Sequence, residues 1–284
     1  MDLVTELNRR GGAARVATLT AAGVPTQAVR AALVQGKVRR VARGVVALPE
    51  AQRVCILAAT IGAEHTCVSA LAAMGIPLPR LDGRPHLAVP HSFTSHGRDL
   101  GGIRLHYVAG RVAAGTSAGI EVALDAAGAC LDEVWHLVAV DSALNKGMIT
   151  VADVAAFRRT TRTRRDFLLS HADGRSQSAG ETIARLLLVR AGHRVCPQAY
   201  VRGAGYVDIE IDGVAILEVD GYAHHDDERS FRRDRERDRV SVTAGRPVLR
   251  YAAGELMSPQ IPDVVAEVRR VLAAWAAPGR GRLN

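Results

Sequence analysis

The last third of the chain contains the runs YVD at residues 206–208 and AILEVDGYAHH at residues 215–225. Both are strand-like, and they carry the carboxylates Asp208, Glu218 and Asp220. Aspartate and glutamate are poor strand formers, and burying them without a partner is costly. A divalent cation such as Mg²⁺ offsets that cost, because it binds through carboxylate and phosphate oxygens. The pattern therefore predicts metal-assisted cleavage of a phosphodiester.

The turn between these runs, at Asp212 and Gly213, decides how the carboxylates lie. A two-residue loop would leave Asp208 and Glu218 on opposite faces of the hairpin, because side chains alternate along a strand. A three-residue loop with Gly213 in the left-handed conformation would place them on one face. Glu218 and Asp220, two residues apart, share a face in either case.

A helix is expected from Ser178 to Gly192, because the segment begins with a capping residue and ends with glycine. Glu181 lies in the first turn, three residues after Ser178. This spacing is typical of a capping box, in which both side chains accept hydrogen bonds from backbone N–H groups. The same position would bring the Glu181 carboxylate to the end of the sheet, beside a metal. The two roles are compatible.

Two basic runs each have two interpretations. Residues 160–165, TTRTRR, fit a solvated connector or a phosphate contact. Residues 229–240 interleave both charges, which fits a helix with internal ion pairs or a helix that lays arginines along a phosphate backbone.

These residues together resemble the Vsr-like domain of unknown function, a branch of the PD-(D/E)XK nuclease superfamily akin to very short patch repair endonucleases. The resemblance implies a nuclease domain at residues 170–277, with a restriction-endonuclease-like mixed sheet flanked by helices. It also implies that Asp208 and Glu218 ligate Mg²⁺, or alternatively Mn²⁺. The matching positions are Glu181, Gln198, Asp208, 218–221, 224–225, 233–235, Gly245 and 248–250.

The resemblance also implies catalytic roles. Glu181 and Asp220 would be further acidic groups of the site, and Asp220 stands where the superfamily commonly has lysine. His225 matches the catalytic histidine of the very short patch repair enzymes. An ordinary pKa of about 6.5 suits it to proton transfer. Arg235 or Arg250 would hold the phosphate through paired hydrogen bonds.

The first fifty residues predict three short helices, at 3–10, 16–23 and 25–36, and a hairpin at 38–48. This is the order of a winged helix-turn-helix, expected at residues 1–50, whose third helix enters the major groove. The alternative is a winged helix that binds protein. Arg30 is the only basic residue on the third helix that could contact a base. The sequence therefore favours DNA binding with little sequence specificity. The expected phosphate contacts of the hairpin are Lys37, Arg39, Arg40 and Arg43.

This segment resembles the N-terminal domain of AbiEi-type antitoxins, which repress transcription in type IV toxin–antitoxin systems. The resemblance implies a DNA partner. Residues 51–165 are similar in order to the α+β middle region of such proteins, with helices at 52–74 (interrupted near Gly62), 120–144 and 150–158 and strands at 85–90 and 103–108. The matching runs are 11–12, 19–23, 29–33, 36–38, 43–45, 141–144 and 147–150.

The cysteines and histidines show no local metal-binding pattern. The cysteines lack zinc spacing and are interpreted as reduced thiols of a cytoplasmic protein. The histidines fit no ligand pattern along a helix or strand and are interpreted as scattered or hydrogen-bonded residues. These residues are Cys55, Cys67, Cys130 and Cys196, and His65, His86, His91, His96 and His106.

The composition favours an anionic partner and no membrane. The net charge is +8 and the isoelectric point about 9.9, which suits nucleic acid. The N-terminus lacks a signal-peptide pattern, and no apolar run approaches the roughly 18–20 residues of a membrane span.

These patterns predict an α/β protein and leave three functions open. One is a metal-dependent DNA endonuclease targeted by the winged helix. Another is an antitoxin-like DNA-binding regulator with an inactive nuclease domain. The third is an RNA-cleaving toxin. Metal-dependent plasmid cleavage separates the first from the second, and a preference for DNA or RNA separates the first from the third.

Overall fold

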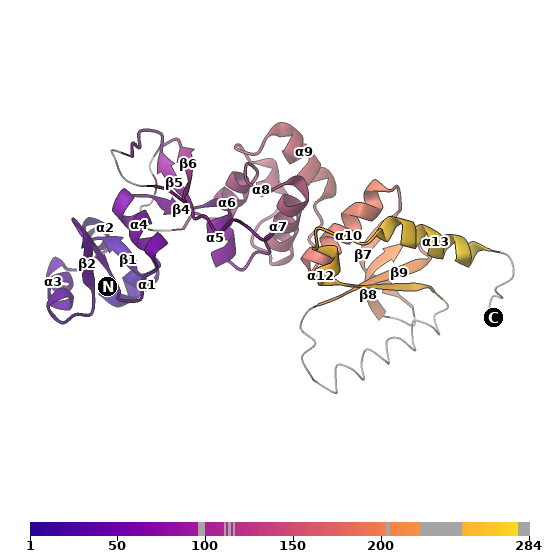
Figure 1. Cartoon of the computed structure of the whole chain (residues 1–284), viewed down its shortest axis with the longest axis horizontal. Helices are drawn as coiled ribbons and strands as arrows, with labels where there is room; N and C mark the ends of the chain where they lie inside the picture. Colours follow the sequence, from indigo (N-terminus) through magenta and orange to yellow (C-terminus); the bar gives the residue numbers. More distant parts are fainter. Residues whose placement is uncertain are drawn as a thin grey trace, which may run out of the picture. The chain divides into compact units, whose positions relative to one another are not determined.

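The computed structural model describes residues 1–95, 100–110, 112, 115, 117–202, 205–221 and 246–277. They form a mixed α/β structure with two compact units (Figure 1). The first unit comprises residues 1–131 with 156–164, and the second comprises residues 132–155 with 165–284. Within the described ranges, none of the helices combines the length and apolar character needed to cross a membrane.

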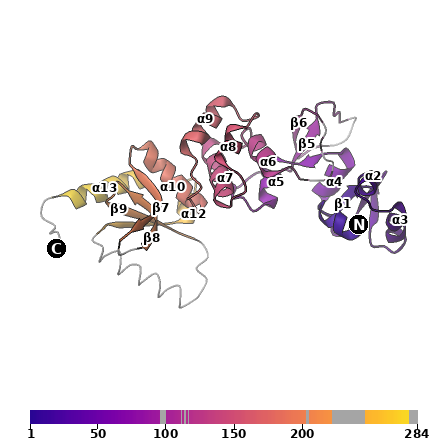
Figure 2. The ribbon, with the colours of Figure 1, turned by 180° about the vertical axis from the view of Figure 1, so that it is seen from behind.

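The first unit begins with three helices and a small antiparallel sheet of order β1-β3-β2. Figure 2 labels β1, α2 and α3 of this part, beside the N-terminus. Leu7, Leu19, Val29 and Val46 are buried in its core. The predicted helices and hairpin are confirmed, whereas strand β1 was not predicted. The elements are α1 (Leu3–Asn8), β1 (Ala13–Arg15), α2 (Val16–Ala21), α3 (Thr26–Val34), β2 (Arg39–Ala42) and β3 (Val45–Ala47).

The rest of the first unit packs three helices around a sheet of order β4-β5-β6. Strands β5 and β6 are parallel, and Leu87 and Val89 of β5 are fully buried. Both strands were predicted, and so was the break in the first helical region at Gly62. The elements are α4 (Arg53–Ile61), β4 (Glu64–His65), α5 (Cys67–Ala73), β5 (His86–Pro90), β6 (Arg104–Val108) and α6 (Ile120–Ala127).

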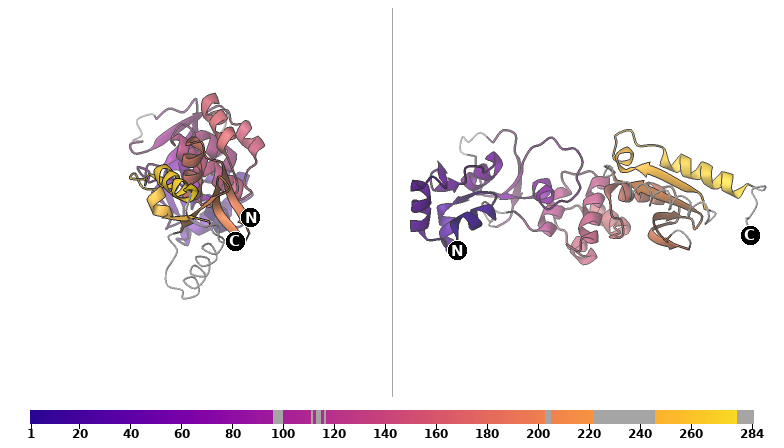
Figure 3. Two further views of the ribbon diagram at one scale, coloured as in Figure 1. Left: turned by 90° about the vertical axis from the view of Figure 1, so that its right-hand side faces the viewer. Right: turned by 90° about the horizontal axis from the view of Figure 1, so that it is seen from below.

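The second unit contains a mixed sheet of order β10-β9-β8-β7, in which only the β10–β9 pair is parallel. Helices α10, α12 and α13 cover one face, where their buried side chains join those of β8, β9 and β10 (Figure 3). The elements are α7 (Glu133–Asn145), α8 (Val151–Ala155), α9 (Arg162–His171), α10 (Ala179–Arg190), β7 (Val195–Val201), β8 (Gly205–Ile211), β9 (Ala215–Asp220), β10 (Val248–Ala252), α12 (Ala253–Leu256) and α13 (Val264–Ala276).

One prediction for the region between the sheets is wrong. The single helix expected at 120–144 is broken after α6, and α7 begins anew where the Asp132 carboxylate accepts a hydrogen bond from the Trp135 amide at 2.8 Å. The basic run at 160–165 contains the boundary between the two units, which falls after residue 164, and its last four residues form the first turn of α9. Leu168 anchors this helix with a fully buried side chain, which the charge pattern of its first turn did not reveal.

Candidate functional site

The hairpin of β8 and β9 sets the relation of the predicted carboxylates. Three residues, 212–214, join the strands, and Gly213 has a left-handed φ of 71°, as the three-residue loop requires. Ile209 pairs with Leu217 and faces the core. Because side chains alternate along each strand, Asp208 and Glu218 both lie on the other face. The three-residue loop is confirmed, and the shared face of the two carboxylates follows from it by alternation.

A neutral amide links two of the acidic groups. The Gln198 amide on β7 donates to Glu181 Oε2 at 3.2 Å and to Asp208 Oδ1 at 3.3 Å. The Val219 N–H donates to Asp208 Oδ2 at 2.8 Å. Neither Glu181 nor Asp208 forms an ion pair with any lysine or arginine in the part of the chain that the structure describes. This acidic pair is therefore uncompensated there.

Helix α10 carries Glu181 to the sheet through a close approach at Gly180. A Cβ atom at Gly180 would lie 2.8 Å from Val219 Cγ1, so only glycine allows this contact. Ser178 caps the helix by accepting from the Glu181 N–H at 3.2 Å. The Glu181 carboxylate accepts from the Gln177 N–H at 2.9 Å. Glu181 thus combines a capping role with a position beside Asp208.

Burial raises the pKa of Glu181, and the negative charge of Asp208 adds to the rise, while the Gln177 N–H opposes it. The side chain is nearly inaccessible, with 4% of the residue exposed. The ionised form of Glu181 is therefore costly in the folded protein, a situation typical of functional sites.

We expect Glu181→Gln to raise the thermal unfolding midpoint of the full chain at pH 7–8 by about 2–4 °C. A pKa raised in the folded state means that Glu181 contributes stability below its ordinary pKa, and loses that contribution as pH rises through the raised value. The advantage of the glutamine variant should accordingly vanish toward pH 4. Circular dichroism melts across this range measure it.

Glu255→Gln is the matched control, because Glu255 also accepts a backbone hydrogen bond in a first helical turn but is exposed. It should show no comparable gain at neutral pH. An equal pH profile for Glu181→Gln and the parent protein would contradict the assigned cost.

The remaining predicted site residues fall into two groups. Glu218 lies beside Arg250, its register partner on β10, and Asp220 is exposed at the end of β9. His225 and Arg235, with His224, lie outside the described residues. Metal ligation by Asp208 and Glu218 stays a prediction.

A second candidate surface lies on the N-terminal module, which comprises residues 1–49. Five exposed basic residues of the module form no ion pair with any described residue, whereas three other arginines are engaged. Arg9 and Arg10 bind Glu6 at 3.0 and 2.7 Å, and Arg15 donates to the Ala59 and Thr60 carbonyls. The exposed set is Arg30, Lys37, Arg39, Arg40 and Arg43.

The charge of this module is strongly one-sided. Residues 1–49 contain eight lysines and arginines against Asp2 and Glu6, a net charge of +6 out of +8 for the chain. No acidic residue occurs between positions 7 and 49. Such a field attracts a polyanion and is screened by salt.

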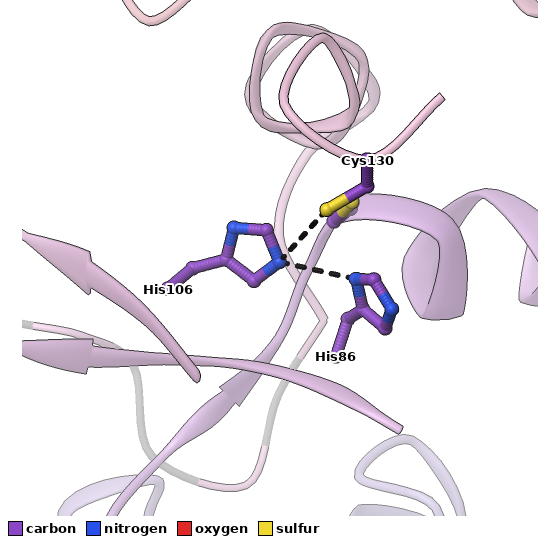
Figure 4. Close-up of side chains that lie close together, drawn as sticks. His86, His106 and Cys130 are labelled. Atoms are coloured by element: carbon purple, nitrogen blue, oxygen red, sulfur yellow. Dashed lines mark hydrogen bonds between the residues drawn. The ribbon is translucent and has the colours of Figure 1, made fainter. Parts of the chain in front are cut away.

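The structure corrects the interpretation of the histidines as scattered. The side-chain ligand atoms of four residues from separate elements of the first unit lie within 4.8 Å of one another. His86 Nδ1 is 3.1 Å from His106 Nε2, and Cys130 Sγ is 3.8 Å from that same nitrogen (Figure 4). The fourth residue of this cysteine–histidine cluster is Cys67.

Local sequence could not reveal this cluster, because its members are separated by 19 to 24 positions and come from a helix start, two strands and a turn. Zinc motifs recognisable in sequence instead pair ligands two to five residues apart. Only the parallel pairing of β5 with β6 brings the two histidines to one face.

Residues 1–49 match the family model described as "Transcriptional regulator, AbiEi antitoxin". The search of curated proteins found no match for the chain. The family-model match supports the resemblance drawn from the N-terminal residues. It does not reach the second unit, so the resemblance of that unit to Vsr-like nucleases stays a prediction.

Proposed function

We propose that this chain is a DNA-binding transcriptional regulator of the antitoxin type, whose N-terminal module docks on the duplex as a winged helix. The observation that carries the proposal is the set of exposed cations on the module matched by the regulator family. Helix α3 would lie in the major groove, with the β2–β3 hairpin as the wing on the phosphate backbone.

The residues of α3 indicate how much sequence the module reads. Thr26, Gln27 and Arg30 are exposed on the helix, while Val29 and Ala32 are buried in the core. Arginine pairs with guanine and glutamine with adenine in the major groove. With only these two side chains suited to bidentate base contacts, phosphate contacts dominate the affinity.

Replacing the four basic residues of the wing with alanine should weaken DNA binding and flatten its dependence on salt. Each phosphate contact contributes about 0.9 to the slope of log K against log [salt], so four lost contacts reduce the slope by about 3–4. Fluorescence anisotropy of a labelled duplex at several salt concentrations measures both quantities. The replaced residues are Lys37, Arg39, Arg40 and Arg43.

A matched variant removes four exposed arginines outside the module, Arg80, Arg84, Arg158 and Arg270. It loses the same net charge and should keep most of the salt slope. Equal loss in both variants would mean that net charge alone governs binding, and an unchanged slope in the wing variant would reject the docking.

A metal-dependent nuclease is the second candidate function, and the uncompensated pair of Glu181 and Asp208 favours it. Carboxylate oxygens fit a hard cation such as Mg²⁺, and the neutral Gln198 bridge supplies no positive charge. When bound, the ion would polarise the phosphate and lower the pKa of a water. The exposed Tyr206, two residues before Asp208 on the same strand, packs edge-on against Tyr200 and offers a surface for base stacking.

A further inference from the structure

We propose that Cys67, His86, His106 and Cys130 bind one Zn²⁺ ion in a four-coordinate structural site of the first unit. The proposal is independent of the DNA-binding function and of the acidic site in the second unit. It begins with the donor set, because two thiols and two imidazoles are a combination that zinc prefers in closed tetrahedral sites.

The distances suit a tetrahedron of zinc ligands. Bond lengths of about 2.0–2.1 Å to nitrogen and about 2.3 Å to sulfur imply edges of about 3.3 Å between nitrogens and about 3.6 Å between nitrogen and sulfur. The observed separations are 3.1 Å for His86 Nδ1 to His106 Nε2 and 3.8 Å for Cys130 Sγ to His106 Nε2. All four ligand atoms lie within 4.8 Å of one another, so one central ion can reach each of them.

The four ligands come from elements that the ion would join. Cys67 is the first residue of α5, His86 begins β5, His106 is the third residue of β6, and Cys130 lies in the turn after α6. His86 and His106 project from the same face of two paired parallel strands. The ion would therefore link the sheet to the packed helices α5 and α6.

Burial and charge favour metal over a merely hydrogen-bonded cluster. Cys67 and His86 are buried, with 0% and 6% of the residue exposed. Two thiolates balance the charge of Zn²⁺, so the complete site is neutral and suits a buried position.

An entry path lies beside the cluster. A cavity of about 330 Å³ opens next to it, and His106 and Cys130 belong to its lining. Both residues are partly exposed, whereas Cys67 and His86 form the inner side of the site. An ion could reach the four ligands from this cavity without unfolding the unit.

Metal analysis of the tag-free full chain tests the proposal. We expect one zinc ion per chain after purification. Cobalt(II) added to chelator-treated protein should give the intense visible absorption of tetrahedral thiolate-bound Co²⁺, and equimolar Zn²⁺ should displace it. Removal of the ion should lower the unfolding midpoint reversibly, because metal binding stabilises the folded state.

Cysteine variants give the matched comparison. Cys130→Ser and His106→Gln should weaken cobalt binding by roughly a hundredfold or more. Cys55→Ser and Cys196→Ser should bind as the parent does, since neither thiol belongs to the cluster. The cobalt titration of the parent protein decides the question even if a ligand variant fails to fold.

Three results would overturn the proposal. One is a parent protein that carries no zinc and binds no cobalt under reducing conditions. Another is equal loss of metal in the Cys55→Ser or Cys196→Ser control. The third is a disulfide between Cys67 and Cys130 in protein kept reduced during purification, because that bond would remove both thiolate ligands.

Discussion

Arg185→Met should destabilise the second unit by about 3–5 kcal/mol, the cost of leaving a buried carboxylate without its cation. The guanidinium of Arg185 on α10 donates to Asp141 Oδ2 on α7 at 2.7 Å. The two side chains are only 6% and 1% exposed. Chemical denaturation of the full chain, followed by circular dichroism, measures the loss.

The pH dependence of this loss identifies its cause. Burial raises the pKa of Asp141 to about 6, against the opposing effects of Arg185, the Asp173 N–H and the Thr182 hydroxyl. Without Arg185 the pKa rises further, and the folded state then binds a proton over a wider pH range. The destabilisation should accordingly grow as pH rises through 6 and shrink toward pH 4.

Two further variants complete the test. Asp141→Asn combined with Arg185→Met should recover part of the loss, because the pair is then removed together. Arg190→Met, on the same helix, should cost no more than about 1 kcal/mol, since its ion pair with Glu133 is exposed. A cost independent of pH, or one equal to that of Arg190→Met, would contradict the role assigned to the buried pair.

Short-range rules predicted the elements that are built locally. The loop at Gly213 has the three-residue form that the sequence offered, and the predicted hairpin at 38–48 turns at Gly44, where φ is also positive. The shared face of Asp208 and Glu218 then followed from counting residues across the loop. Alternation along a strand makes such counting reliable once the loop length is known.

Interactions between distant residues were beyond those rules. Strand β1 has three residues and exists only because β3 pairs with it. Asp141 and Arg185 stand 44 positions apart and meet where α7 packs on α10. The cysteine–histidine cluster depends in the same way on the pairing of β5 with β6. In each case tertiary packing brings together residues that no local pattern links.

The contrast between the two candidate functions also has a physical basis. The regulator hypothesis depends on exposed positive charge. The number and positions of the basic residues in the sequence indicate such charge before any fold is known. The nuclease hypothesis depends on the distances between the three carboxylates of the acidic site. It also depends on residues 222–245, which lie outside the described ranges. Among the described residues, the acidic groups do not converge on one point as tightly as the ligand atoms of the cysteine–histidine cluster do.

Asp208→Asn should lower any Mg²⁺- or Mn²⁺-dependent cleavage of DNA by about a hundredfold or more, because it removes the ligand charge that the cation needs. The asparagine oxygen can still accept the Val219 N–H, so the hairpin should keep its shape. Supercoiled, linear, single-stranded and mismatched DNA are the substrates, with RNA as the parallel series. Manganese binding measured by calorimetry supplies a readout that does not depend on turnover, and it should weaken in the same variant.

Glu210→Gln is the matched control, since Glu210 lies two residues away on the same face of β8 and is paired with Arg246. It should cleave and bind manganese as the parent does. If the parent cuts none of the substrates with either metal, the nuclease function is rejected and the regulator remains. If Asp208→Asn cuts at the parent rate, the acidic pair is not the catalytic site.

Since Glu181 would lose a negative neighbour in the Asp208→Asn variant, its pKa should fall even where cleavage is absent. Electrostatic coupling between the two carboxylates can therefore be tested whether or not the protein is an enzyme.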